Sequence, residues 1–472
     1  MTLPRLWAFL AVALPTLAAL LATMSSIDLT YQLRAGGEIL DARAIPTVDT
    51  WTYTVAGEPW FDQQWGAQVL LTLVYDVGGW TGLVLLRAAL VAVIFGCTFL
   101  IARGAALSDR SAALLTLGAF AIAAPALALR PQLFGMALFA LVLLLLARRG
   151  AQPRAVWLIP VLVLLWANLH GSFLLGPLAV GLAWLADVQR RAERRHRLLA
   201  VAVASVATAC VTPFGPAVWR YAIGLSTDPS VTGRITEWQR TSITDVVGLL
   251  FYASVVAVIA LVVLRRSAVT WPTLLWLAGF AAIGAYAVRG IAWWALAAVP
   301  VVAALVASGG PVRPQRQGTP SMQRLNLVVV AVIVLAGVAL LPIWRPVDPR
   351  NGTPQGLVTD APPGVTASLR DLARPGEHLF NPQPWGSWVE FALPDLLVAV
   401  DSRVELFPAS VWTDYDAVRT GVPGWEAILE RWAVTLVALE PGEAAMKDRL
   451  EGAGWTLVSA DDSGAVLRRS DR

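Results

Sequence analysis

The sequence predicts a polytopic α-helical membrane protein of about eleven transmembrane helices, followed by a small C-terminal α/β domain. Three observations lead to this fold class. The 472 residues are 57% hydrophobic and only 14% charged, whereas soluble globular chains are about a quarter charged. Long apolar runs follow one another as far as residue 343, and arginines gather in alternate gaps between them. From Arg345 onward the composition becomes proline-rich and mixed polar, and the long runs stop.

The apolar runs define the expected membrane helices, since a spanning helix needs roughly 20 apolar residues and at least about 17. In chain order the runs are 6–23, 82–101, 111–129, 133–147, 155–169, 172–186, 198–212, 246–264, 269–288, 291–308 and 325–343. Several are shorter than the lower limit. The tip ANLHGS between the fifth and sixth runs is predicted to be a tight turn inside protein, because lipid does not solvate bare backbone.

The distribution of charge predicts the orientation in the membrane. Alternate loops hold clustered arginines and few acids, including the run QRRAERRHR at 189–197, whereas the first loop holds seven acids and two arginines. Positive charge marks the cytoplasmic side. The amino terminus is therefore predicted in the cytoplasm and the first loop outside the plasma (inner) membrane. An odd number of spans places the tail outside as well.

The segment QQWGAQVLLTLVYDVGG (63–79) is apolar on average, but its uncharged part is about 11 residues long and too short to span. We predict a helix in the outer interface, with Trp65 as an interfacial anchor. The expected organisation is a transmembrane domain over 1–344, with an acidic external loop over 24–81, and a soluble extracytoplasmic α/β domain over 345–472.

Polar side chains that need an explanation gather on the predicted outer face. They are Asp28, Asp49, Trp65, Arg130, Asn168, His170, Glu237 and Arg289. Each has a purely structural alternative. Asp28 can cap a helix that follows two serines, the arginines can anchor helix ends at the interface, and His170 beside Asn168 can satisfy backbone groups in a turn.

Together these residues suit a water-accessible cleft in which a lipid-linked phosphate is displaced. An aspartate would take the proton from an acceptor hydroxyl, and arginines would neutralise the departing phosphate. The sequence shows no Gly-rich nucleotide loop, and none is expected for a lipid-bound donor. No cofactor is predicted, since Cys97 and Cys210 lie in apolar runs without metal spacing, although the sequence leaves a divalent metal undecided. The scattered arginines do not indicate nucleic acid.

An ordered set of stretches resembles the GT-C superfamily of membrane glycosyltransferases, and more narrowly a bacterial branch of undefined substrate. The stretches are DLTYQLRAGGEILDARAIPTVDTWTYTVAGEPWFDQQW, LRPQLFG, WANLHGSFLLG, TPFGP, ITEW, VRGIAWW, FNPQPWGSWVEFALPD and VAVDSRVELF. The resemblance implies a GT-C-like fold, a polyprenyl-phosphate donor, Asp28 as general base and Asp49 as a second acidic position. Two departures argue against a metal site of paired carboxylates: Gln63 and Gln64 replace a His-Glu-like pair, and Leu29 follows Asp28 where several active members have a second acid.

The tail is predicted to consist of alternating strands and helices. EHLFN, LLVAVDSR and AVTLVALE are predicted strands, WTDYDAVRTG and GWEAILERW are predicted helices, and GWTLVSADDSGAVLRR is a predicted hairpin. Asp401 and Arg403 follow a strand, where ligands commonly bind in open α/β sheets. The alternative is an Asp–Arg pair that only fixes its loop. The domain could bind an acceptor or cover the cleft.

Two functions are consistent with these patterns. The first is an inverting glycosyltransferase that moves a sugar from a polyprenyl-phosphate donor to an extracytoplasmic glycan, lipid or protein acceptor. The second is a non-catalytic membrane protein, either a transporter of a lipid-linked intermediate or a scaffold. A transporter should place ionisable groups near the midplane and break its helices there. The charged groups here crowd the outer face instead, which favours the enzyme.

Overall fold

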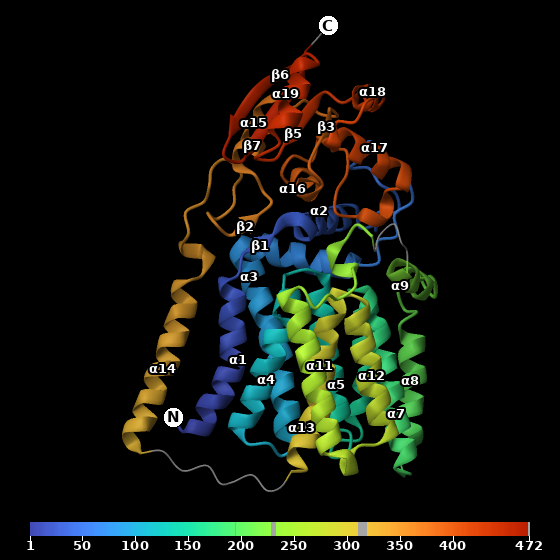
Figure 1. Ribbon diagram of the computed structural model, residues 1–472, viewed down its shortest axis with the longest axis vertical. Coiled ribbons are helices and arrows are strands. Elements are labelled where there is room, and N and C mark those ends of the chain that lie inside the picture. The colour runs from blue at the N-terminus through green and yellow to red at the C-terminus, as the bar shows by residue number, and fades with distance from the viewer. Residues whose placement is uncertain (194, 228–232, 310–318, 471–472) are drawn as a thin grey trace. The chain divides into compact units, whose positions relative to one another are not determined.

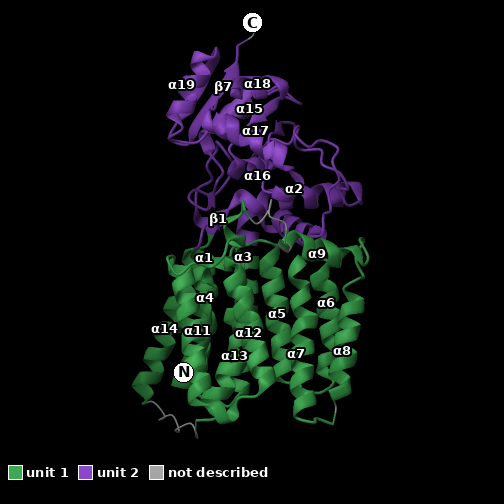
Figure 2. Cartoon of the chain, turned by 45° about the vertical axis from the view of Figure 1, so that its right-hand side comes forward, with its two compact units in different colours: residues 1–21, 84–341 green, residues 22–83, 342–472 purple. Residues whose placement is uncertain are grey.

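The computed structural model describes residues 1–193, 195–227, 233–309 and 319–470 (Figure 1). The chain divides into two compact units, each made of two chain segments (Figure 2). Unit 1 comprises Met1–Leu21 and Val84–Leu341, and unit 2 comprises Ala22–Leu83 and Pro342–Arg472. The sequence grouped the first loop with the membrane helices, whereas the compact units group it with the tail.

Unit 1 is a bundle of apolar helices. Beside the second part of α3 (Trp65–Gly104), its α-helices are α1 (Leu3–Leu21), α4 (Asp109–Ala123), α5 (Pro131–Ala147), α6 (Ile159–Ala167), α7 (Leu175–Gln189), α8 (Arg195–Thr208), α9 (Ala217–Thr227), α11 (Val246–Leu264), α12 (Trp271–Tyr286), α13 (Ile291–Ala307) and α14 (Pro320–Ala339). Short 3-10 helices join them: η1 (Ala124–Ala126), η2 (Ala155–Leu158), η3 (Gly171–Leu174), η4 (Thr236–Trp238), η5 (Arg266–Ala268) and η6 (Val288–Gly290). Each of the eleven predicted runs overlaps one α-helix.

Six helical segments among the described residues are long and apolar enough to cross a membrane. They are Leu3–Leu21, Trp65–Gly104, Gly171–Gln189, Val246–Leu264, Val288–Ala307 and Pro320–Ala339. Three further apolar helical segments are shorter: Pro131–Ala147, Ala155–Ala167 and Trp271–Tyr286. The predicted total of eleven spans therefore stays a prediction.

Local sequence sets where several of these helices begin. Helices α5, α12 and α14 carry proline in the first turn, where its missing N–H costs no hydrogen bond. Thr319 also caps α14, because its side chain accepts a hydrogen bond from the Met322 backbone N–H. The interior of the bundle is aromatic: the Phe139 ring lies 5.6 Å from Trp293 and 6.1 Å from Trp166, centroid to centroid.

Helix α3 is broken at Gly79, whose φ of 55° and ψ of −149° are not helical. A positive φ is unstrained only for glycine, so the break is built into the sequence at this residue. It separates the predicted interfacial segment, 63–79, from the predicted span at 82–101. The boundary between the two compact units follows shortly, after Leu83.

Unit 2 contains a mixed five-stranded sheet in the order β4-β3-β5-β7-β6. The strands of the sheet are β3 (His378–Phe380), β4 (Leu397–Val398), β5 (Leu436–Leu439), β6 (Trp455–Asp461) and β7 (Gly464–Arg469). The α-helices of unit 2 are α2 (Ser26–Ala42), α15 (Pro363–Leu372), α16 (Gln383–Ala392), α17 (Ala409–Thr420), α18 (Trp425–Arg431) and α19 (Ala444–Gly452). Two 3-10 helices, η7 (Pro342–Trp344) and η8 (Val404–Leu406), also belong to it. Strand β3 is parallel to β4 and β5, and β7 is antiparallel to β5 and β6. The small C-terminal sheet that the sequence predicted is thereby confirmed.

Main-chain pairing explains why the first loop belongs to unit 2. Strand β1 (Met24–Ser25) pairs in parallel with β2 (Val358–Thr359). Farther along the loop, the backbone N–H of Tyr53 donates to the Val398 carbonyl at 3.2 Å, and the N–H of Val398 donates to the Trp51 carbonyl at 3.3 Å. The first loop therefore extends the tail by backbone hydrogen bonds at two places.

Candidate functional site

In unit 1, three predicted site residues and two others gather where helices end. Arg130 precedes α5, and its Nη1 donates to Glu237 Oε2 of η4 at 3.0 Å, while its Nη2 pairs with the other carboxylate oxygen. Arg289 of η6 donates from Nη2 to Gln132 Oε1 at 3.3 Å, and its guanidinium lies 4.3 Å from the Trp238 ring centroid. The structure thus brings both predicted arginines together with Glu237.

His170 belongs to the same cluster and is held in one tautomer. The pKa of His170 is well below its ordinary value because of burial and because of the positive charges of Arg289 and Arg130. The Ser172 backbone N–H donates to Nδ1 at 3.1 Å, and the Ser172 hydroxyl lies 2.7 Å from the same atom. Since Nδ1 accepts, the neutral ring carries its proton on Nε2 and presents a hydrogen-bond donor there.

Charge and hydrogen bonding make this cluster suited to an anion. With His170 neutral, the charged side chains Arg130, Arg289 and Glu237 sum to a net charge of +1. The Gln132 side chain is 2% exposed, and its Nε2 has no hydrogen-bond partner among the described residues. Leaving a buried donor unsatisfied costs about 1–3 kcal/mol, so a ligand oxygen or a water is expected there. The arrangement can hold a phosphate with donors from two arginines, an amide and an imidazole.

The motif LRPQLFG now has a structural explanation. It supplies Arg130, Gln132 and Gly135, the last of which faces the side chains that hold His170 in place. A Cβ atom at Gly135 would lie 2.7 Å from Trp166 Nε1 and 2.8 Å from Ser172 Oγ. These two atoms are themselves hydrogen-bonded at 3.1 Å. Glycine is therefore required for the close approach of α5 to the histidine turn.

We expect Gly135→Ala to lower the free energy of unfolding by about 1–3 kcal/mol, because the added Cβ overpacks the site and displaces Ser172. Gly118→Ala is the matched control, because a Cβ there meets no atom within 4 Å. Alanine is favoured over glycine in a helix, so this control should be neutral or stabilising. Thermal unfolding of both variants measures the difference. Equal behaviour would contradict the packing role.

Two further predicted residues have other neighbours. Asn168 ends α6, and its Nδ2 donates to the carbonyls of Leu164 at 2.9 Å and Val211 at 3.0 Å. These bonds give it the structural role that the sequence left open. Trp65 is the first residue of α3 and belongs to unit 2 rather than to the cluster in unit 1.

Asp28 lies in unit 2, in the first turn of α2, and is partly exposed. Ser25 is the N-cap residue of this helix and its side chain accepts from the Ile27 N–H at 3.3 Å, so capping does not require Asp28. Burial, and next the negative charge of Asp28, raise the pKa of Tyr31 well above its ordinary value. Asp28 remains the candidate general base.

Asp49, Asp401 and Arg403 are brought together in the interior of unit 2. Arg403 Nη2 donates to Asp49 Oδ1 at 2.6 Å, and its Nε donates to Asp401 Oδ2 at 2.8 Å. The second oxygen of Asp49 accepts from the backbone N–H and the hydroxyl of Thr52, at 3.1 and 2.7 Å. None of the three charged side chains exposes more than 1% of its surface. Asp49 is therefore placed as a buried ion-pair partner, and this placement favours a positioning role for it.

Glu390 and two tryptophans complete this cluster, which we call the Arg403 cluster. Burial, and next the charge of Asp401, raise the pKa of Glu390 well above its ordinary value. Burial opposes the charge on Arg403, but Asp401, Glu390 and Asp49 outweigh it and raise the pKa of the guanidinium. The guanidinium carbon lies 4.2 and 4.6 Å from the ring centroids of Trp51 and Trp60. The cluster joins the first loop to the tail.

Buried amides line the region around Asp62, also in unit 2. Gln68 Nε2 donates to Asp62 Oδ1 at 2.7 Å, and Gln32 Nε2 donates to Gln64 Oε1 at 2.9 Å. Gln64 thus contributes a structural hydrogen bond at the position where the family pattern departs. Burial raises the pKa of Asp62 to about 7, although the hydrogen bond from Gln68 and the charge of Arg403 oppose this rise.

A pH dependence of stability follows. The pKa of Asp62 rises from 3.8 to about 7 on folding, so its contribution to stability is full below about pH 4 and is lost as pH rises through 7. We expect Asp62→Asn, which keeps the oxygen that accepts from Gln68, to flatten the pH dependence of unfolding between pH 4 and 7 and to stabilise the chain at pH 8. Thermal unfolding at several pH values tests this. Asp41→Asn, on the exposed face of α2, is the control and should leave the slope unchanged.

The sequence did not single out every residue of these two clusters. It missed Gln132, Ser172 and Trp238 in unit 1, although Gln132 and Ser172 lie inside motifs quoted for the resemblance and Trp238 inside ITEW. It also missed Glu390, whose signal was a lone acid in an otherwise apolar helix segment, WGSWVEFA. Among the described residues, no group of three or more His, Cys, Asp or Glu side chains could hold a metal ion.

Comparisons with known proteins bear on the fold alone. No protein-family model and no curated protein matches the sequence. The oligosaccharyltransferase of Archaeoglobus fulgidus in its apo form is similar in structure, with a TM-score of 0.58, 12% identity and coverage of 99% of this chain and 74% of that one. AglB from the same organism, in complex with an inhibitory peptide and a dolichol-phosphate, gives a TM-score of 0.55 at 11% identity, covering 98% and 74%. ArnT from Cupriavidus metallidurans bound to undecaprenyl phosphate gives 0.51 at 14% identity and covers 97% of each chain.

The fold and its apolar helices define an integral membrane protein. The chain shares its fold with these solved structures, which agrees with the fold that the resemblance implied.

Proposed function

We propose that the chain is an integral-membrane glycosyltransferase that moves a sugar from a polyprenyl-phosphate donor to an extracytoplasmic acceptor. The observation that carries the proposal is the cluster of Arg130, Gln132, His170 and Arg289 in unit 1. Its donors suit a phosphate, and the cluster lies among apolar helices that suit a polyprenyl chain. The fold supports the same function, since one similar structure contains dolichol-phosphate and another contains undecaprenyl phosphate.

The proposed reaction is a single displacement. Asp28 removes the proton from the acceptor hydroxyl, whose oxygen attacks the anomeric carbon of the donor. A new carbon–oxygen bond forms as the bond from the anomeric carbon to the phosphate oxygen breaks, so the configuration at that carbon inverts. The electron pair leaves with the polyprenyl phosphate, and the proton remains on Asp28.

The unit 1 cluster would stabilise the phosphate that leaves. Arg130 and Arg289 provide positive charge where negative charge develops, and the amide of Gln132 and the Nε2–H of His170 provide neutral hydrogen bonds. Because His170 is already neutral, its donor stays in place without a proton transfer. The acceptor is a glycan, a lipid or a protein outside the plasma membrane, with the amino terminus in the cytoplasm and unit 2 on the outer side.

Transfer from a panel of synthetic polyprenyl-phosphate sugars by the purified full chain tests the proposal. We expect turnover with at least one donor, and we expect Arg289→Gln to weaken donor binding by roughly tenfold or more, since a hydrogen bond to a charged group contributes about 1.5–3 kcal/mol. Arg266→Gln, which removes the same charge from an exposed position in η5, should not change donor binding.

The same assay separates the rival functions. Lipid-phosphate binding without turnover on any donor would contradict the enzyme and favour a transporter or a scaffold. Equal loss of donor binding in the Arg289 and Arg266 variants would contradict the assignment of the unit 1 cluster as the phosphate site.

A further inference from the structure

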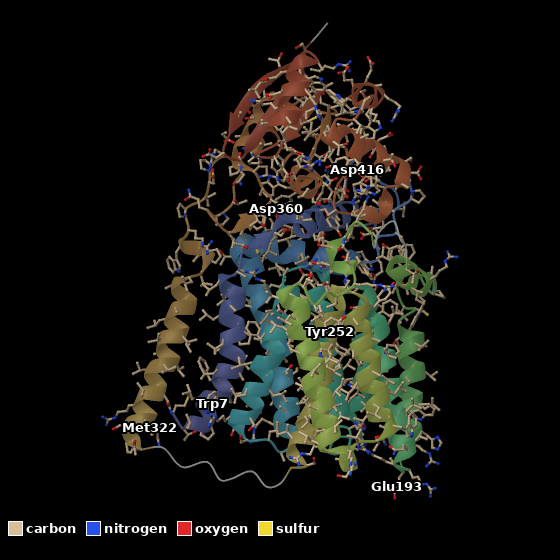
Figure 3. The ribbon with its side chains drawn as sticks, in the orientation of Figure 1. Trp7, Glu193, Tyr252, Met322, Asp360 and Asp416 are labelled. Carbon is tan, nitrogen blue, oxygen red and sulfur yellow. The ribbon has the colours of Figure 1, made fainter. Side chains whose placement is uncertain are left out.

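A polar pocket in unit 1 is lined by residues other than those of the Arg130 and Arg289 cluster. It has a volume of about 530 Å³ and is bounded by the C-terminal ends of α5 and α7, by η2 and by the start of α8. Its walls include Arg149, Pro153, Arg190, Glu193, Arg197 and Leu198. Figure 3 shows Glu193 toward the same end of the unit 1 helices as Met322. The charge pattern predicts that this end faces the cytoplasm.

The pocket lies between two arginine-rich loops. Residues 148–154 and 187–197 contain eight arginines against two acids, which leaves six excess positive charges in 18 residues. Part of this charge is fixed in place: Arg149 donates from Nη2 to Asp187 Oδ1 at 2.9 Å and from Nη1 to the Leu146 carbonyl at 2.8 Å. Arg197 donates to the Pro153 carbonyl at 2.7 Å, so it joins the two loops across the pocket.

The local electrostatics are unfavourable without an anion. Helix α8 begins with Arg195, His196 and Arg197 and has no acid in its first turn, although a helix N-terminus is itself positive. An anion at such an end would be stabilised by the backbone N–H groups as well as by the side chains. Arg191 adds a second sign, because its φ of 49° is a left-handed conformation that glycine would adopt with less strain.

We propose that this pocket binds the phosphate of an acidic phospholipid from the predicted cytoplasmic leaflet. Arg190 and Arg197 contact the phosphate, and the start of α8 faces it. The walls favour a lipid over a free anion, because Ala147, Val156 and Leu198 line the pocket beside the arginines and offer an apolar surface to the glycerol and the first acyl carbons. Basic pockets between membrane helices on this side are a recognised form of lipid site.

Native mass spectrometry of the full chain, in detergent with equal amounts of phosphatidylglycerol and phosphatidylcholine, tests the proposal. We expect the wild type to retain phosphatidylglycerol preferentially and Arg190→Gln/Arg197→Gln to lower its retention roughly tenfold or more. Arg266→Gln/Arg324→Gln removes the same charge at two exposed positions that do not line the pocket and should leave retention unchanged. Glu193→Gln, which removes an opposing charge from the wall, should raise it.

Two complementary measurements keep the test decisive. The loss of Arg197 in the double variant could disturb the fold. Arg190→Gln alone changes an exposed side chain and keeps Arg197, so it should lower phosphatidylglycerol retention without this effect. Addition of inorganic phosphate should leave the retained phosphatidylglycerol bound. Displacement of the lipid by phosphate would overturn the assignment in favour of a free anion, and an equal fall in both double variants would show that the arginines act only through total charge.

Discussion

Asp28→Asn should lower kcat for glycosyl transfer by about 10²–10⁴-fold, since a positioned general base contributes an acceleration of that size. The substitution keeps the shape of the side chain and removes its ability to take a proton. Ser25 still caps α2 in the variant, and the attraction of a carboxylate to a helix N-terminus contributes about 0.3–1 kcal/mol, so we expect the variant to fold. Single-turnover transfer, with donor binding measured separately, gives the result.

Asp41→Asn is the matched control for this experiment. Asp41 is on the same helix and exposed, and no role in the reaction is proposed for it. Its variant should transfer sugar at the wild-type rate. If Asp28→Asn also transfers normally while binding donor, the general base lies elsewhere, and a helix-end role for Asp28 would be the better account.

Arg403→Met should lower the free energy of unfolding by about 3–5 kcal/mol, because removing one partner of a buried ion pair leaves the other charges uncompensated. Asp49 and Asp401 would lose their shared cationic partner in a region without exposed surface. Methionine still fills the space beside the rings of Trp51 and Trp60, so the loss would come from charge rather than from packing. Denaturant unfolding of the full chain, followed by tryptophan fluorescence, measures it.

Two variants make this result specific. Arg431→Met removes an exposed arginine that pairs with Asp414, and it should change stability by less than about 1 kcal/mol. Adding Asp49→Asn to Arg403→Met should recover part of the loss, since one buried charge is then removed. An additive effect of Asp49→Asn and Arg403→Met would show that the two side chains do not act as a pair.

The membrane helices were predictable because each carries its own signal. An apolar run such as 246–264 needs no knowledge of its neighbours to be recognised as a helix, and α11 has those bounds. The sequence also indicated a boundary near Gly79, since it predicted an interfacial segment over 63–79 and a separate span over 82–101. Helix α16 was not predicted, because it is short and its buried Ser387 and Glu390 interrupt the apolar pattern, while its packing against α2 depends on the folded chain.

The candidate sites were predictable only as separate residues. Arg130, Glu237 and Arg289 could be placed at helix ends, but a single sequence does not say which ends meet. Asp49 and Arg403 each carried a functional interpretation of its own until the structure showed them paired. Complementary charges separated by 354 positions leave no local pattern, so only the folded chain reveals the pair.

Unit 2 is built from two segments that lie far apart in the sequence, and this has a consequence for biosynthesis. At about 5–20 residues per second, roughly 20–70 s pass between the synthesis of Asp49 and that of its partner Arg403. During this interval the whole of the inserted segment 84–341 is made, while β1 lacks its neighbouring strand and Trp51 and Trp60 lack the cation that packs against both rings. The first loop must therefore persist as an unfinished surface, open to proteases and chaperones, until the last third of the chain has been synthesised.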